Sequence, residues 1–187
     1  MSSAVVVGVV TRTGSAVAVT LGGSAAVPRF LGRREFELVP AGLPAQPYHA
    51  AADMDLARAA QMIARVERAA EQAAAAGLRA LADVVQAAPR AVAVVVKPAA
   101  VPEELAGVLR SHAWMHAAEG LLYREAVLAA VSSCGWTAHA VQQSALPAAE
   151  HALVELGQVA GRPWRRAEKD AARAAMTLIP PVGDKWP

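Results

Sequence analysis

The sequence predicts an α/β fold, with helices on both faces of a mixed sheet that combines a three-stranded antiparallel meander with two parallel strands. Two runs, AVVVGVVT (4–11) and AVAVVVK (91–97), are rich in valine and almost wholly apolar. Such runs are typical of strands that are buried on both faces. The order of the expected elements agrees, because three strands come first and strands then alternate with helices.

Composition and charge limit the classes of protein that fit. The chain has 187 residues, which favours a single domain (1–179) followed by an irregular tail (180–187). Hydrophobic residues make up 55% but aromatic residues only 4%, so small side chains must build a closely packed core. A net charge of +2 does not indicate a polyanion binder unless the charge is concentrated in a patch. The apolar runs are too short to span a bilayer, so we expect a cytoplasmic protein with no membrane partner.

The first forty residues predict three antiparallel strands. The strand at 4–11 is followed by the turn RTGS and by a second apolar run, AVAVTLGG (16–23). The third strand, REFELV (34–39), alternates charged and apolar residues, as a half-exposed strand does. Short connections between neighbouring strands predict a meander.

The rest of the chain predicts helices and two more strands. Residues 40–52 hold three prolines and are expected to be irregular. The elements expected after them are a long helix at 53–88, a strand at 91–97, a helical region at 102–133 closed by Gly135, a strand at 136–141, a helix at 147–161 with Pro147 in first position, and a helix at 165–179.

Two segments resemble a known family. AAEGLLYREAVLAAVSSCGWTAHAV (117–141) is an expected helix followed by a short strand, and EKDAARAAMTLI (168–179) is a final helix with an aspartate among alanines. Together with the order of strands and helices, these segments resemble the ribonuclease H-like superfamily, and within it the Holliday-junction resolvase (RuvC-like) branch. The resemblance covers most of the chain as topology and these two segments as sequence.

The resemblance implies two divalent cations held between carboxylates of the first strand, the fourth strand and the last helix. This sequence departs from that pattern, because the first strand carries Val9, Val10 and Thr11 and the fourth ends in Lys97. Only Asp170, in the last helix, stands where a carboxylate is expected. One carboxylate cannot build a two-metal site. We therefore expect a protein that is non-catalytic or degenerate as a nuclease and that binds nucleic acid or a protein partner.

The segment SHAWMHAAEGLLYREA (111–126) is the strongest candidate for a site. Its intervals of four and three residues put four polar side chains on one helical face, namely His112, His116, Glu119 and Tyr123. Three interpretations stay open: a metal site of the two histidines and the glutamate, an acid/base cluster, or a hydrogen-bonded structural network. The alternative function is a metal-dependent hydrolase or nuclease with a relocated catalytic site built on His112, His116, Glu119 and Asp170.

A basic segment, GRPWRRAEKDAAR (161–173), is the candidate contact for nucleic acid. The residues proposed to make this contact are Arg162, Trp164, Arg165, Arg166, Lys169 and Arg173. Arginines bind phosphates, a tryptophan stacks on bases, and Pro163 makes the start of the following helix a candidate anion site. The other interpretation is a solvated helix face with Trp164 in the core.

Shorter features leave further hypotheses open. The turn TRTGS (11–15) could hold a phosphate through its hydroxyl and backbone groups, although an ordinary hairpin also accounts for it. Tyr48 and His49 lie in the irregular segment, and no residue nearby in the sequence completes a catalytic triad with them. The sequence identifies no cofactor. A divalent metal at the histidines and a homo-oligomer formed through the long 53–88 helix remain hypotheses.

Overall fold

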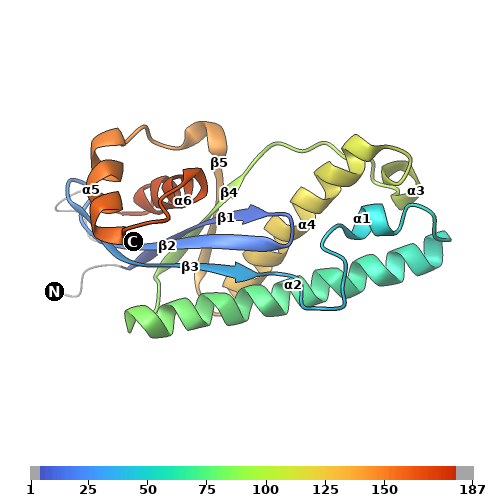
Figure 1. The fold of residues 1–187 in the computed structure, drawn as a ribbon, viewed down its shortest axis with the longest axis horizontal. Helices are drawn as coiled ribbons and strands as arrows, with labels where there is room; N and C mark the ends of the chain where they lie inside the picture. The colour runs from blue at the N-terminus through green and yellow to red at the C-terminus, as the bar shows by residue number, and fades with distance from the viewer. Residues whose placement is uncertain (1–4, 180–187) are drawn as a thin grey trace.

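A five-stranded mixed sheet lies between two helical layers in the computed structural model, which describes residues 5–179 (Figure 1). The predicted tail at 180–187 lies outside these residues. The strands are β1 (Val6–Arg12), β2 (Ser15–Gly23), β3 (Pro28–Glu37), β4 (Ala91–Val96) and β5 (Thr137–Gln142). Their order across the sheet is β3-β2-β1-β4-β5, with β1, β2 and β3 antiparallel and β4 and β5 parallel to β1. This confirms the predicted fold class.

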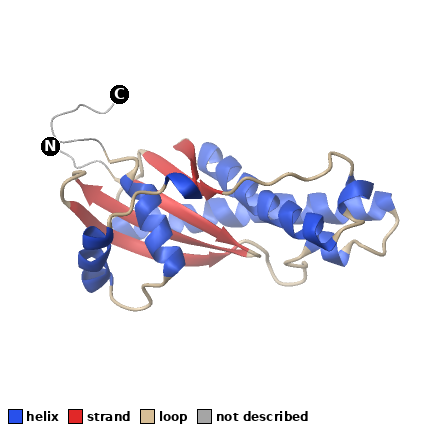
Figure 2. Ribbon diagram, turned by 90° about the horizontal axis from the view of Figure 1, so that it is seen from above, coloured by secondary structure: helices blue, strands red, loops and turns tan. Residues whose placement is uncertain are grey.

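The central strands are buried on both faces, because successive side chains point to opposite sides of a strand. Val7 and Val9 of β1 belong to one core, which α2 (Leu56–Val85) and α4 (His112–Ser133) cover. Val6 belongs to a second core under α5 (Glu150–Ala160) and α6 (Arg166–Met176). Figure 2 shows the two layers from above. The unbroken valine runs follow from this double coverage.

The layer formed by α2 and α4 has the helix ends that its sequence favours. Asp55 caps α2 by accepting a hydrogen bond from the Arg58 backbone N–H at 3.0 Å. Gly77 lies inside α2, where the Phe36 ring occupies the space that a Cβ would need, 2.5 Å away. Gly135, with φ of +75°, follows the end of α4, as predicted. Both helices extend beyond the sheet toward α1 (Pro47–Ala50) and α3 (Leu105–Val108) (Figure 1).

Several element boundaries differ from the expectations, and four of the differences have a structural reason. The third strand begins at Pro28 rather than at 34, because pairing with β2 extends it through a stretch without alternation. The expected irregular segment contains the short helix α1, which Pro47 starts. Ser111 caps α4 and so separates it from α3. The helix expected to start at Pro147 starts at Glu150, since Ala149 has a positive φ. No helix of residues 5–179 is long and apolar enough to cross a membrane.

Candidate functional site

A pocket of about 530 Å³ opens where the carboxyl ends of β1 and β4 meet the first half of α4. Neighbouring parallel strands end at the same edge of a sheet, and this edge is where sites on such folds are commonly built. The polar lining comes from Thr11, Arg12, Thr13, Lys97, His116, Arg124 and Gln143. Among residues 5–179, none of those that line this pocket is an aspartate or a glutamate. We call it the Arg124 pocket.

Arg124 is the most unusual group in this pocket. Only 9% of the residue is exposed, and its Nη2 atom is buried without a hydrogen-bond partner in the part of the chain that the structure describes. No carboxylate of the described chain forms an ion pair with it. Burial lowers the pKa of its guanidinium, and the neighbouring Glu125 only partly offsets this effect. A guanidinium nevertheless stays charged near neutral pH, so the pocket contains a buried positive charge that forms no direct ion pair with a described carboxylate.

The rim of the Arg124 pocket adds one exposed cation and two hydroxyl groups. Lys97 is exposed just after the end of β4. Arg12 is compensated, because its Nη1 lies 2.9 Å from Oε1 of Glu35. Thr11 and Thr13 come from the turn TRTGS that the sequence singled out. The edge expected to carry acidic metal ligands therefore has a net positive lining.

Asp170 does not join this lining or the histidines of α4. It lies on α6, in the layer on the other face of the sheet. Its carboxylate accepts hydrogen bonds from Arg173 Nη1 at 3.0 Å and from Gln143 Nε2 at 3.4 Å. The Arg166 guanidinium lies 3.6 Å away. The one carboxylate at a position of the family pattern is therefore already paired with arginines.

The basic segment 161–173 is largely neutralised by neighbouring carboxylates. Arg165 forms ion pairs with Glu168 at 3.2 Å and with Glu35 at 3.3 Å. Arg173 pairs with Glu150 at 2.5 Å as well as with Asp170. Of the four arginines in this segment, Arg165 and Arg173 are therefore committed to intramolecular pairs and Arg166 approaches Asp170, whereas Arg162 is exposed.

The start of α6 is already capped by a side chain, and Trp164 is already packed against its neighbours. The Glu168 carboxylate accepts a hydrogen bond from the Arg165 backbone N–H at 3.0 Å, where a bound anion would have to lie. Burial alone would raise the pKa of Glu168, but hydrogen bonds from backbone N–H groups and from Arg165 lower it. The Trp164 ring is half-buried against Gly157, and its Nε1 donates to the Leu153 carbonyl at 3.0 Å. Trp164 therefore packs as a core residue rather than as a stacking platform.

The polar stripe of α4 faces the segment 45–50, which wraps over it. Tyr123 donates a hydrogen bond to the Ala45 carbonyl at 2.6 Å. Glu119 is 2% exposed, and its Oε1 accepts from Nδ1 of His49 at 2.8 Å and from the His49 backbone N–H at 3.3 Å. His49 is therefore the central partner of this stripe, although no spacing in the sequence linked it to α4.

Three imidazole rings meet at the exposed end of the stripe. The ring centroid of His49 lies 4.8 Å from that of His112 and 4.4 Å from that of His116. The ring centroids of His112 and His116 are 4.5 Å apart. One ring nitrogen from each histidine can be chosen so that all three lie within 4.8 Å of one another. The structure thus groups His112, His116 and Glu119, as the helical spacing predicted, and adds His49.

Removing the Tyr123 hydroxyl is expected to have two separable effects. Tyr123→Phe should lower the free energy of unfolding by about 0.5–1.5 kcal/mol at pH 7, because the bond to Ala45 is lost. Burial, and secondarily Glu119, raises the pKa of Tyr123. Since the unfolded phenol ionises near pH 10 and the folded one only at higher pH, stability should fall above about pH 10. Urea unfolding across pH 7–11 should show a smaller alkaline loss in the variant; an unchanged loss would contradict the assignment.

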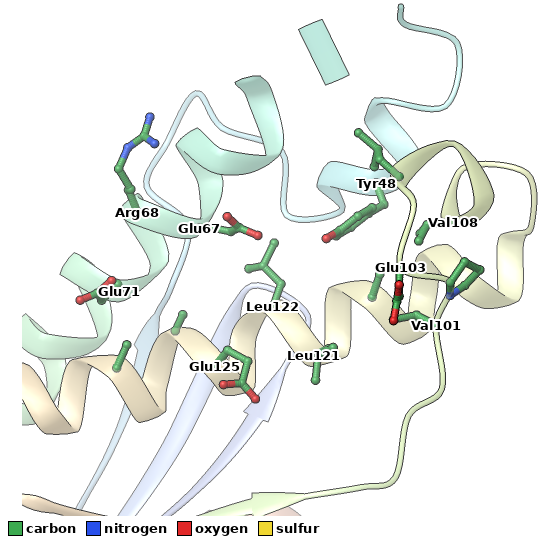
Figure 3. Close-up of a pocket in the computed structure, with 15 residues that line it drawn as sticks. Tyr48, Glu67, Arg68, Glu71, Val101, Glu103, Val108, Leu121, Leu122 and Glu125 are labelled. Atoms are coloured by element: carbon green, nitrogen blue, oxygen red, sulfur yellow. The ribbon is translucent and has the colours of Figure 1, made fainter. Parts of the chain in front are cut away.

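A second pocket, of about 650 Å³, lies between α2 and α4 (Figure 3). Its charged lining is mainly acidic, from Glu67, Glu71, Glu103 and Glu125, with Arg68 as the one arginine. Burial raises the pKa values of Glu67 and of Tyr48, whose side chains approach each other in Figure 3. This pocket has the wrong charge for a phosphate backbone. The helix α4 thus separates an acidic pocket from the cationic Arg124 pocket.

Comparison with solved structures identifies the class of fold. This chain has the ribonuclease H-like fold in its RuvC-like form, as the sequence resemblance predicted. One neighbour is the T. thermophilus RuvC in complex with Holliday junction substrate, with a TM-score of 0.54, 18% identity, and coverage of 94% of this chain and 92% of that chain. Another is a Thermus thermophilus RuvC structure, with a TM-score of 0.51, 19% identity, and coverage of 93% and 92%. No family model matches the sequence, and no curated protein matches it.

Proposed function

We propose that this protein binds nucleic acid by placing a backbone phosphate in the Arg124 pocket, and that it does not cut nucleic acid by a two-metal mechanism. The observation that carries the proposal is the buried Arg124 guanidinium, whose Nη2 has no hydrogen-bond partner and which forms no ion pair among the described residues. A buried charge without a partner is unfavourable, so a site that keeps one is suited to an anionic ligand.

Phosphate fits the donors of the pocket better than a single carboxylate does. Arginine presents several N–H donors in a planar fork that matches phosphate oxygens. Lys97 adds a point charge at the rim, and Thr11 and Thr13 add hydroxyl donors beside it. A phosphodiester carries negative charge on two oxygens, so it can contact the buried guanidinium and the rim together.

The lack of acidic groups argues against nuclease activity at this edge. Two-metal catalysis needs several carboxylates that converge on one point. Thr11 and Lys97 stand at this edge instead, and Asp170 is held by Arg173 and Arg166. The solved neighbour bound to a Holliday junction supports nucleic acid as the ligand class. The shape of the nucleic acid is a question for the experiment.

The test is fluorescence anisotropy with labelled single-stranded, duplex and four-way-junction DNA at several salt concentrations. Lys97→Gln and Arg124→Met should each weaken binding about tenfold, and Lys97→Gln should reduce the slope of log K against log salt by about one. Arg79→Gln is the matched control, because Arg79 is exposed on α2 next to a different pocket. Equal affinities for wild type and both pocket variants would contradict the proposal.

Cleavage is tested on the same DNA with Mg²⁺ or Mn²⁺ added. We expect intact substrate after prolonged incubation at saturating protein. Metal-dependent cleavage that disappears in Asp170→Asn would overturn the non-catalytic part of the proposal. Binding to the Arg124 pocket would be judged separately, from the anisotropy of the variants.

A further inference from the structure

The three histidines at the start of α4 form a cluster that nucleic-acid binding does not require. His112 and His116 lie one helical turn apart on α4, and His49 reaches them from α1, more than sixty residues earlier in the chain. His112 and His116 are exposed, whereas His49 is half-buried with a side-chain exposure of 21%. Two elements that are distant in sequence thus present imidazole nitrogens to one point.

The orientation of His49 is set by a buried carboxylate. Glu119 accepts a hydrogen bond from Nδ1 of His49 at 2.8 Å, so Nδ1 carries a proton, and in the neutral ring the other nitrogen, Nε2, has a free lone pair. That Nε2 is buried and has no hydrogen-bond partner. A carboxylate behind one imidazole nitrogen, with the other nitrogen left open, is the outer-sphere arrangement that orients metal-bound histidines.

Glu119 is also within reach of a second histidine. Its Oε2 is buried without a hydrogen-bond partner and lies 3.6 Å from Nδ1 of His116. A small rotation of the exposed His116 ring would let the same carboxylate orient it. The two free atoms in this cluster, Oε2 of Glu119 and Nε2 of His49, would both gain partners when an ion is bound at the imidazoles.

We propose that His49, His112 and His116 bind one zinc ion, with a fourth position open to water, and that Glu119 orients the ligands without coordinating the ion. Three neutral imidazoles and an open position form a known zinc ligand set. Tetrahedral coordination with bonds of about 2.0–2.1 Å places the ligand nitrogens about 3.4 Å apart. The nitrogens already lie within 4.8 Å of one another, and the exposed His112 and His116 can rotate to close the difference.

This assignment changes the role that the helical spacing suggested for Glu119. The sequence predicted Glu119 as a third ligand, but the carboxylate lies behind His49 rather than among the free ring nitrogens. His116 also lines the Arg124 pocket, so the zinc ion would lie at the rim of that pocket. Zinc binding by the protein alone does not depend on the proposed nucleic-acid function, and the two can fail separately.

The experiment is isothermal titration of Zn²⁺ into chelator-stripped, tag-free protein without nucleic acid, together with the visible absorption of bound Co²⁺. We expect one equivalent to bind, and tetrahedral Co²⁺ absorption to appear. Affinity should be lower at pH 5.5 than at pH 7.5, because protons compete with the metal for imidazole. Zinc should also raise the thermal midpoint of unfolding, because it binds only the folded site.

Variants separate the ligands from the residue that orients them. His112→Gln with His116→Gln should abolish binding, and both positions are exposed, so the fold is kept. Glu119→Gln should keep the one-to-one stoichiometry but weaken binding about 10–100-fold. His151→Gln, an exposed histidine on α5, is the control and should bind as wild type does. Absence of zinc binding to wild type, or equal binding by the double histidine variant, would overturn the proposal.

Discussion

Gly8→Ala is expected to lower the free energy of unfolding by at least about 3 kcal/mol or to prevent folding. A Cβ at position 8 would overlap the Ala171 carbonyl oxygen and come within 2.7 Å of the Ala175 backbone nitrogen. Both are backbone atoms of α6, which cannot turn away as a side chain can. The helix would have to move off β1 and open the core beneath it.

Urea unfolding monitored by circular dichroism measures this effect, with Gly120→Ala as the matched control. At Gly120 a Cβ would meet only Nη1 of Arg124, 3.8 Å away. That substitution should stabilise the protein by about 0.5–1 kcal/mol through helix propensity alone. The two glycine-to-alanine changes should therefore have opposite signs. A loss below about 1 kcal/mol in Gly8→Ala would mean that α6 does not lie this close to the strand.

Parts of the fold were predictable from the sequence where burial leaves a clear pattern in composition or polarity. Alanines fill the buried face of α6, and the alanine-rich, aromatic-poor composition had indicated closely packed elements. The valine runs identified the strands covered on both faces because burial there leaves no polar position. The start of β3 was not predictable, since residues 28–33 have no alternating pattern and become a strand by pairing with β2.

The site was predictable only where its residues share one helix. The spacing on α4 placed His112, His116 and Glu119 together, because helical geometry fixes those neighbours. His49 could not be found in this way, since the fold of the irregular segment brings it to Glu119. Asp170 was expected near these residues as one alternative, but α6 crosses the opposite face of the sheet.

The Arg124 pocket was missed for a related reason. Arg124 occupies an ordinary helical position in the sequence, and its burial follows from the way α4 lies over the ends of β1 and β4. Lys97 and Thr11 stand where the family pattern has carboxylates, and in the sequence alone they indicate only that metal ligands are missing. In the folded protein Lys97 and Thr11 line the same pocket as the buried Arg124, so all three can contribute to binding an anion.

Arg124→Met is expected to raise the free energy of unfolding by about 1–3 kcal/mol while it weakens nucleic-acid binding. The methionine side chain is apolar and of similar length, and it removes a buried guanidinium whose Nη2 has no hydrogen-bond partner among the described residues. Burial lowers the pKa of Arg124 more than the neighbouring Glu125 raises it, in the direction expected for a charge that is partly desolvated. Replacing the guanidinium with an apolar side chain of similar length therefore removes the cost of desolvating a charge in the folded state.

Urea unfolding of the free protein and DNA anisotropy together test this trade-off. If Arg124 serves packing, its substitution should lower the free energy of unfolding of the protein. If it serves a ligand, its substitution should raise the free energy of unfolding and weaken DNA binding. Lys97→Gln serves as the control, because Lys97 is exposed and its change should weaken binding with stability within about 0.5 kcal/mol of wild type. Added DNA should stabilise wild type more than Arg124→Met, since only wild type gains a counterion for the buried charge. A loss of more than about 1 kcal/mol in Arg124→Met would show instead that the guanidinium stabilises the fold.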